Sequence, residues 1–217
     1  LVRSFDDHLE KLGARGLKYD RFINRVTDCL ASGSHAQYQE GLEFLGRLLG
    51  FTASRPSYGG STDCRWRGEF GNAREVITWE AKIEHVPSGK IALKDLGQAH
   101  GQQARAAGEY GTRGYTIRAA LVTHLDQLEG DAVSSVGGLK LLSKSTAMAL
   151  WERVRTLLSQ YRSRWDLDDV SLRAAAAAQL RPVVPATGWL VRALDAASPW
   201  VTSDAVLAEW GVALRSA

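Results

Sequence analysis

The sequence has few of the residues that cross-link or anchor a protein. Its 217 residues include two cysteines, Cys29 and Cys64, and neither has a second cysteine nearby. This spacing suggests neither a disulfide framework nor a zinc site, and it favours a reducing intracellular location, which we expect to be the cytoplasm. No apolar run approaches the roughly 18–20 residues of a membrane-spanning helix, and there is no signal-peptide pattern, so we expect no membrane association.

Methionine is rarer still. The chain opens on Leu1, and its single methionine is Met148. Because an intact gene product normally starts with methionine, we expect this chain to be part of a longer protein.

An excess of charge of one sign is also lacking. Lys and Arg number 27 against 24 Asp and Glu, a formal net charge of +3, which permits a nucleic-acid partner without demanding one. Apolar residues, in contrast, make up 45% of the chain and include seven tryptophans. A chain of this length and composition can bury a core and forms one domain with additions, or one and a half domains.

Hydrophobic periodicity predicts alternating helices and strands. Residues 1–33 have helical spacing, and a second helix follows Ser34, whose distance from Gln37 predicts a capping box. Apolar residues of that second helix recur at helical spacing: Tyr38, Gly41, Leu42, Leu45, Leu48 and Leu49. Strands are predicted at 63–67, 75–84, 115–124 and in "GLKLLSKS", a glycine-containing helix at 92–109, and a strong helix at 147–165.

This order predicts the α/β class, with a small mixed β-sheet flanked by helices. We divide the chain into a helical lead-in at 1–33, a core at 34–165 and a small helical appendage at 166–217, which is rich in alanine.

One predicted strand has an unusual face. In "EVITWEAKIE", residues 75–84, Ile77, Trp79, Ala81 and Ile83 would form an apolar face, whereas the other face carries Glu80 and Lys82. Asp63, on the neighbouring strand, is expected on that second face. Two carboxylates and an ammonium group are costly to bury unless paired or metal-bound, and a hard divalent cation would account for them. For Glu80 and Lys82 alone, a solvent-facing ion pair worth about 0–1 kcal/mol is the simpler interpretation.

The pattern Asp63…Glu80-Ala81-Lys82 follows a leucine-rich helix that ends in Gly-aromatic and precedes a glutamine-bearing helix. In this it resembles the PD-(D/E)xK nuclease superfamily over residues 34–164. The segments "LGRLLGFTASRPSYGGSTDCRW", "VITWEAK" and "IALKDLGQAHGQ" are most similar to nuclease domains of bacterial helicase-associated and defence proteins. The resemblance implies a restriction-endonuclease-like core that hydrolyses DNA with Mg²⁺, for which Mn²⁺ can substitute. It also implies DNA as partner and further domains, such as a helicase, in the parent protein; homo-oligomerisation is left open.

The resemblance also implies roles for single residues. Asp63 and Glu80 would hold the metal with the main-chain carbonyl of Ala81, while Lys82 would orient or activate the attacking water. Gln98 would position water or a phosphate. Many relatives add a glutamate from the first core helix; Glu40 is the candidate, although Gln39 matches better by its distance from Gly50. Thr62 stands where the motif has proline.

Other functions stay open. A catalytically silent module on the same fold would bind DNA or dock a protein, and a purely structural α/β domain is favoured if Asp63, Glu80 and Lys82 lie on different faces. Paired carboxylates also occur in glycoside hydrolases, but the strand-borne Lys82 argues against that class. His100 is interpreted as structural or surface-exposed. The candidate phosphate track consists of basic residues around the last strand and helix: Lys140, Lys144, Arg153, Arg155, Arg162 and Arg164.

Overall fold

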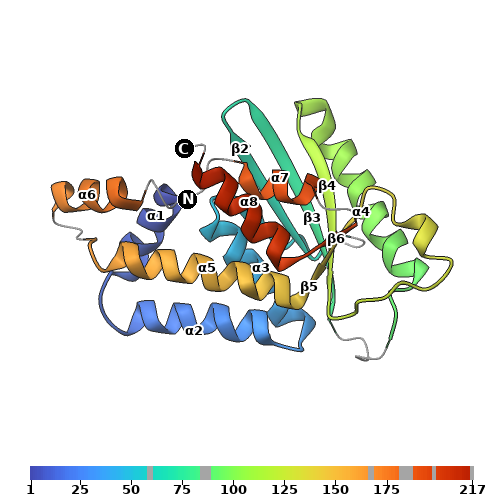
Figure 1. The fold of residues 1–217 in the computed structure, drawn as a ribbon, viewed down its shortest axis with the longest axis horizontal. Helices are drawn as coiled ribbons and strands as arrows, with labels where there is room; N and C mark the ends of the chain where they lie inside the picture. Colours follow the sequence, from blue (N-terminus) through green and yellow to red (C-terminus); the bar gives the residue numbers. More distant parts are fainter. Residues whose placement is uncertain (58–60, 84–88, 166–168, 181–187, 197–198, 216–217) are drawn as a thin grey trace.

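A mixed β-sheet lies at the centre of the computed structural model, which describes residues 1–57, 61–83, 89–165, 169–180, 188–196 and 199–215 (Figure 1). The strands follow one another in chain order across the sheet. The first three pair antiparallel, and those from the third onward pair parallel. They are β1 (Thr52–Ser54), β2 (Cys64–Phe70), β3 (Ala73–Lys82), β4 (Thr116–Thr123), β5 (Lys140–Ser143) and β6 (Trp200–Val201). The predicted α/β class is confirmed.

Helices cover both faces of this sheet (Figure 1). One face packs against α4 (Leu93–Tyr110), whose Leu96 and Ala99 share a buried cluster with Leu121 of β4. The opposite face packs against a helical layer that includes α1 (Val2–Leu12), α2 (Leu17–Ala31), α3 (His35–Leu48) and α5 (Lys144–Arg162). The remaining elements are the 3-10 turns η1 (Gly111–Arg113) and η2 (Val133–Ser135), and the helices α6 (Val170–Leu180), α7 (Trp189–Ala196) and α8 (Ser203–Arg215).

The helical layer has the larger core, centred on two tryptophans of the sheet. Trp66 of β2 is fully buried, its ring centroid lies 4.5 Å from that of Trp79 on β3, and its indole N–H donates to the carbonyl of Leu42 at 3.0 Å. A Cβ added at Gly46 of α3 would lie 2.5 Å from the Trp66 indole nitrogen. The glycine therefore lets α3 approach the sheet at the position of the indole.

Helix α3 begins where predicted, but without the predicted capping box. The Ser34 side chain makes no capping hydrogen bond. The Ser32 hydroxyl accepts the Ser34 N–H at 2.9 Å and donates to Gln37 at 2.6 Å, so it links the N-cap residue to the first turn of α3.

The C-terminal part of the chain is helical as predicted, but it also joins the central sheet. Strand β6 pairs in parallel with β5. Trp189 and Leu190 of α7 and Val206 of α8 belong to the buried cluster of the helical layer. The described residues after 165 therefore extend the core. No helix in the described ranges is both long and apolar enough to cross a membrane.

Candidate functional site

Asp63, Glu80 and Lys82 lie at one end of the sheet: Glu80 and Lys82 contact α4, whereas Asp63, one residue before β2, contacts α3. Strand β2 pairs Cys64 with Trp79, so continuing this register by one residue places Asp63 opposite Glu80. Asp63 is fixed there because its Oδ2 accepts the Ala81 N–H at 2.7 Å. In a strand, the N–H and C=O of one residue point to the same edge, so the Ala81 carbonyl also faces the side of Asp63.

Glu80 is a buried carboxylate with a partner on each oxygen. The residue is 1% exposed; its Oε1 lies 2.9 Å from the Lys82 ammonium group, and its Oε2 accepts from Gln102 at 2.5 Å. Burial raises the pKa of Glu80, the negative charge of Asp63 raises it further, and Lys82 and Gln102 act in the opposite direction. The side chain therefore holds its proton to a higher pH than an exposed glutamate would.

Lys82 connects the strand to α4. Its ammonium group donates to Gln98 Oε1 at 2.8 Å and lies 3.8 Å from Asp95 Oδ1, and the side chain is 18% exposed. Gln98 and Gln102 lie four residues apart on one face of α4, so Gln98 contacts Lys82 while Gln102 contacts Glu80. The glutamine-bearing helix thus approaches the charged strand end through both residues.

Asp95 belongs to this cluster, although it was not a candidate from the sequence. It is 3% exposed, and its Oδ2 accepts the Ala92 N–H at the start of α4, at 3.2 Å. An acid in the first turn of a helix usually has this capping role. The capping position is the only feature of the sequence that singles out Asp95, and it does not predict that Asp95 lies near Lys82.

Helix α3 contributes the remaining partners of Asp63. Gln39 donates to Asp63 Oδ1 at 2.6 Å, and His35 Nε2 lies 3.0 Å from Asp63 Oδ2. Gln39 is the residue that spacing from Gly50 favours, whereas His35 was missed. The available signal for His35 was its position four residues before Gln39, which places both on one helix face.

Glu40, the candidate metal ligand of α3, does not face Asp63. Its carboxylate forms a two-pronged ion pair with Arg25 of α2, at 2.8 and 3.0 Å, and this hydrogen bonding lowers the pKa of Glu40. Successive helical residues point about 100° apart. Because Gln39 faces Asp63, Glu40 is turned away, and the metal-ligand prediction for it is corrected.

The donor set has the chemistry that a small hard cation requires. Two carboxylates and the Ala81 carbonyl gather at one strand end, and Mg²⁺ is commonly held by one or two carboxylates while it keeps several waters. Within the described ranges, no three or more His, Cys, Asp or Glu side chains are arranged to hold a metal ion. Asp63 and Glu80 thus do not form an enclosing cage of carboxylates in the described ranges.

Residues outside this cluster have structural partners. His100 Nε2 lies 2.9 Å from the Ser135 carbonyl, in agreement with the structural interpretation. Glycines 97 and 101, which could have allowed a close helix approach, have nothing within 4 Å of an added Cβ. They therefore do not mediate a close contact of α4 within the described structure.

The predicted phosphate track is also wrong in part. Lys144 donates to the carbonyls of Ala31 and Ser32, both at 2.6 Å, and burial lowers its pKa. Arg162 donates to the Ala14 carbonyl, and Arg155 pairs with Glu152, both at 2.5 Å. These residues belong to α5, on the face of the sheet opposite Glu80.

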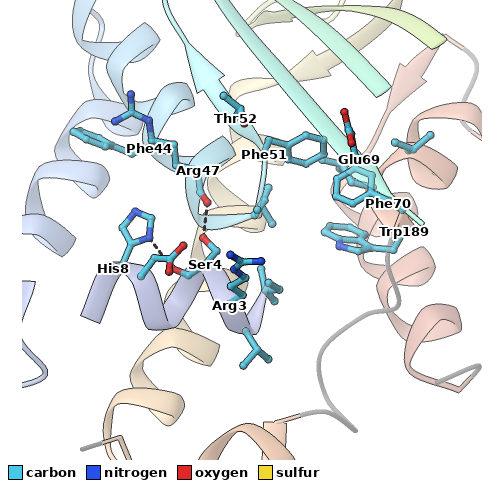
Figure 2. Close-up of a pocket in the computed structure, with 18 of the residues that line it drawn as sticks. Arg3, Ser4, His8, Phe44, Arg47, Phe51, Thr52, Glu69, Phe70 and Trp189 are labelled. Atoms are coloured by element: carbon cyan, nitrogen blue, oxygen red, sulfur yellow. Dashed lines mark hydrogen bonds between the residues drawn. The ribbon is translucent and has the colours of Figure 1, made fainter. Parts of the chain in front are cut away.

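A cavity of about 1010 Å³ lies at the other end of β2. Figure 2 shows it between α1, α3, β1 and α7, with Phe51, Phe70 and Trp189 grouped on one side and the hydrogen bond from Ser4 to the Arg47 carbonyl on the other. Strand β2 extends about 20 Å from its start, next to Asp63, to Phe70 at the cavity. None of the predicted site residues lines this cavity.

Comparisons with known proteins found no matching family model, curated protein or solved structure.

Proposed function

We propose that this domain is a metal-dependent nuclease that hydrolyses DNA phosphodiester bonds, as the resemblance to the PD-(D/E)xK superfamily implies. One observation carries the proposal: buried Glu80 lies 2.9 Å from Lys82 and within the electrostatic influence of Asp63, at one end of the sheet. A fold has no packing reason to collect two carboxylates and an ammonium group there, because buried charge is costly. Metal-dependent phosphodiester hydrolysis can use such a set, with the carboxylates as metal ligands and the ammonium group beside the attacking water.

The chain's own groups would each have a distinct task. Lys82 places a positive charge at the rim of the cluster, where it can stabilise the negative charge that develops on the phosphoryl oxygens or hold the attacking water. Gln98 fixes the Lys82 ammonium through its 2.8 Å hydrogen bond. Gln102 and the Ala81 N–H fix the orientations of the Glu80 and Asp63 carboxylates. Such pre-oriented groups favour catalysis because little reorganisation accompanies the reaction.

Asp63, Glu80 and the Ala81 carbonyl would hold the metal ion. When bound, a divalent ion supplies Lewis acidity and neutralises charge on the phosphoryl group.

A second candidate, a silent DNA-binding or protein-docking module, is favoured by a different observation. Both oxygens of Asp63 and both oxygens of Glu80 already have partners at hydrogen-bonding distance within the protein. A cation would have to displace some of these partners, whereas a silent module would keep them all.

Cleavage assays on the 217-residue chain separate the two candidates. We expect cutting of plasmid or linear duplex DNA with Mg²⁺ or Mn²⁺ and none with EDTA. Glu80→Gln should lose both cutting and metal affinity, because a neutral amide is a poor ligand for a hard cation. Metal affinity can be measured by calorimetry without DNA. Absence of cutting with either metal, together with no measurable Mn²⁺ binding, would support the silent module.

A further inference from the structure

Strand β2, which begins one residue after Asp63, carries arginines on the face covered by α4. Arg65 and Arg67 are two residues apart in β2, so their side chains project to one side at an interval of about 6.6 Å. Arg67 lies opposite Val76 of β3. Val76 packs against α4 residues, which identifies this side as the face of Glu80.

Two further arginines extend this row. Glu69 of β2 lies two residues after Arg67 and pairs with Arg74 of β3. The Arg74 guanidinium donates to the carbonyl of Arg113 in η1 at 3.1 Å. Both Arg74 and Arg113 are exposed. We call Arg65, Arg67, Arg74 and Arg113 the arginine strip.

The strip has more positive than negative charge, and part of it is held in place. Arg65 pairs with Glu109 of α4 at 2.9 Å and lies 5.0 Å from the centroid of the Tyr110 ring, and Arg113 lies 5.8 Å from the same centroid. Glu69 is the other acid within the strip, and it accepts from the Tyr115 hydroxyl at 2.6 Å. The side chain of Arg67 forms no hydrogen bond or ion pair with any residue in the described ranges.

Two tyrosines lie at the strip: buried Tyr110, and half-buried Tyr115, whose ring centroid is 6.0 Å from Arg74. Tyr110 is 4% exposed, and its ring lies beneath Arg65 and Arg113. None of the aromatic side chains whose burial the structure describes is exposed. Modules that bind single strands combine basic residues with exposed aromatic platforms, whereas contacts to duplex backbones come largely from arginine and lysine. The composition of the strip thus favours a duplex.

We propose that the arginine strip binds the sugar-phosphate backbone of duplex DNA and directs it toward Asp63 and Glu80. This inference rests on the proposed nuclease function and adds the form of the substrate and its path. The arginine strip takes the place of the α5 residues as the predicted phosphate track.

The test compares two double variants of the 217-residue chain that lose the same charge. Arg67→Gln/Arg74→Gln removes two guanidinium groups from the strip, and Arg3→Gln/Arg21→Gln removes two exposed ones from α1 and α2, in the opposite layer. Binding of a fluorescent duplex is measured by anisotropy in EDTA at several salt concentrations. Each lost phosphate contact lowers the slope of log K against log salt by about 0.9. When the salt concentration rises from about 50 to about 200 mM, the affinity of the parent should fall by a larger factor than that of the strip variant. The two factors should differ by about tenfold.

A charge-preserving variant and two other ligands complete the test. Arg67→Lys/Arg74→Lys should restore most of the slope, and thermal melts should match the parent for all variants. The proposal is overturned if both glutamine variants bind the duplex alike, or if the parent binds no duplex. It is also overturned if single-stranded DNA binds as tightly through the strip, or if polyglutamate displaces the duplex at equal charge, which would indicate an acidic protein partner.

Failure of the strip and failure of the proposed function give different results. If the strip variant cuts and binds the duplex normally, the proposal for the arginine strip is rejected and the nuclease proposal stands. If duplex binding depends on the strip but no divalent metal supports cutting, the nuclease proposal is rejected and the proposal for the arginine strip stands.

Discussion

The two faces of β3 show how one strand serves two purposes. Toward the helical layer, Ile77, Trp79 and Ala81 are buried among other apolar side chains. Toward α4, the same strand ends in Glu80 and Lys82, whose partners are glutamines and acids. The apolar face gains stability from burial at about 25 cal/mol per Å², whereas the charged face must offset desolvation with hydrogen bonds. Burial of the apolar face therefore contributes the stability that offsets the cost of desolvating the charged face.

The largest effect should come from the apolar face. Trp66→Ala removes a fully buried indole that contacts Trp79 and donates to Leu42. We expect the free energy of unfolding to fall by about 3–5 kcal/mol, measured by urea denaturation. Thr78→Ala on the charged side removes one buried hydroxyl bonded to the Arg118 carbonyl and should cost no more than about 1.5 kcal/mol. Equal losses for the two variants would show that the two faces do not differ as described.

The next effect concerns the charged face and is catalytic. Lys82→Ala removes the ammonium group but leaves both carboxylates, so DNA cutting should slow by about 10²–10³-fold. Lys94→Ala, at an exposed position of α4, provides the matched control and should cut like the parent. Single-turnover cleavage with Mg²⁺ measures both. Full activity in Lys82→Ala would mean that the catalytic assignment is wrong.

Two helix glycines give a comparison of intermediate size. Gly46→Ala would place a methyl group 2.5 Å from the buried Trp66 indole, whereas Gly97→Ala on α4 meets nothing within 4 Å. We expect Gly46→Ala to lower the free energy of unfolding by about 1–3 kcal/mol through overpacking. Gly97→Ala should raise it by about 0.5–1 kcal/mol, because alanine favours the helix. If both changes stabilise the protein, α3 does not pack against Trp66 as closely as described.

Sequence patterns predicted the regular parts of the fold because burial imposes a period. The helical stripe containing Tyr38, Leu42 and Leu45 is buried as predicted, and the alternation in residues 75–83 correctly separates Trp79 from Glu80. The short strands β1 and β6 were missed. A strand of two or three residues carries too few side chains to show a period, and only its neighbours in the sheet define it.

The candidate site was predictable along the strands and less so across helices. Asp63, Glu80 and Lys82 come together because strand register fixes their faces. Asp95 and His35 reach the same cluster through tertiary packing, which no local pattern specifies. The error at Glu40 has a related cause: neighbouring helix positions differ by about 100°, so a shift of one residue decides which side chain faces Asp63.

The smallest effect concerns the pH dependence of stability and tests whether Glu80 is strained by burial. Burial and the charge of Asp63 raise the pKa of Glu80, so the folded protein binds this proton more tightly than the unfolded chain does. The stabilising effect of that proton is complete below the ordinary glutamate pKa and is lost as the pH rises through the raised value. Glu80→Gln cannot titrate. Its stability relative to the parent should therefore increase as the pH rises across this window, and Lys82 and Gln102 should keep the increase small.

Urea denaturation in EDTA from about pH 4 to about pH 8 measures this difference. Thr78→Ala, a change on the same face of β3 that removes no titrating group, is the control, and its difference from the parent should not vary with pH. A difference between Glu80→Gln and the parent that falls with rising pH would mean that Lys82 and Gln102 outweigh the cost of burying the Glu80 charge. The cluster would then be stable with Glu80 ionised even without a metal ion.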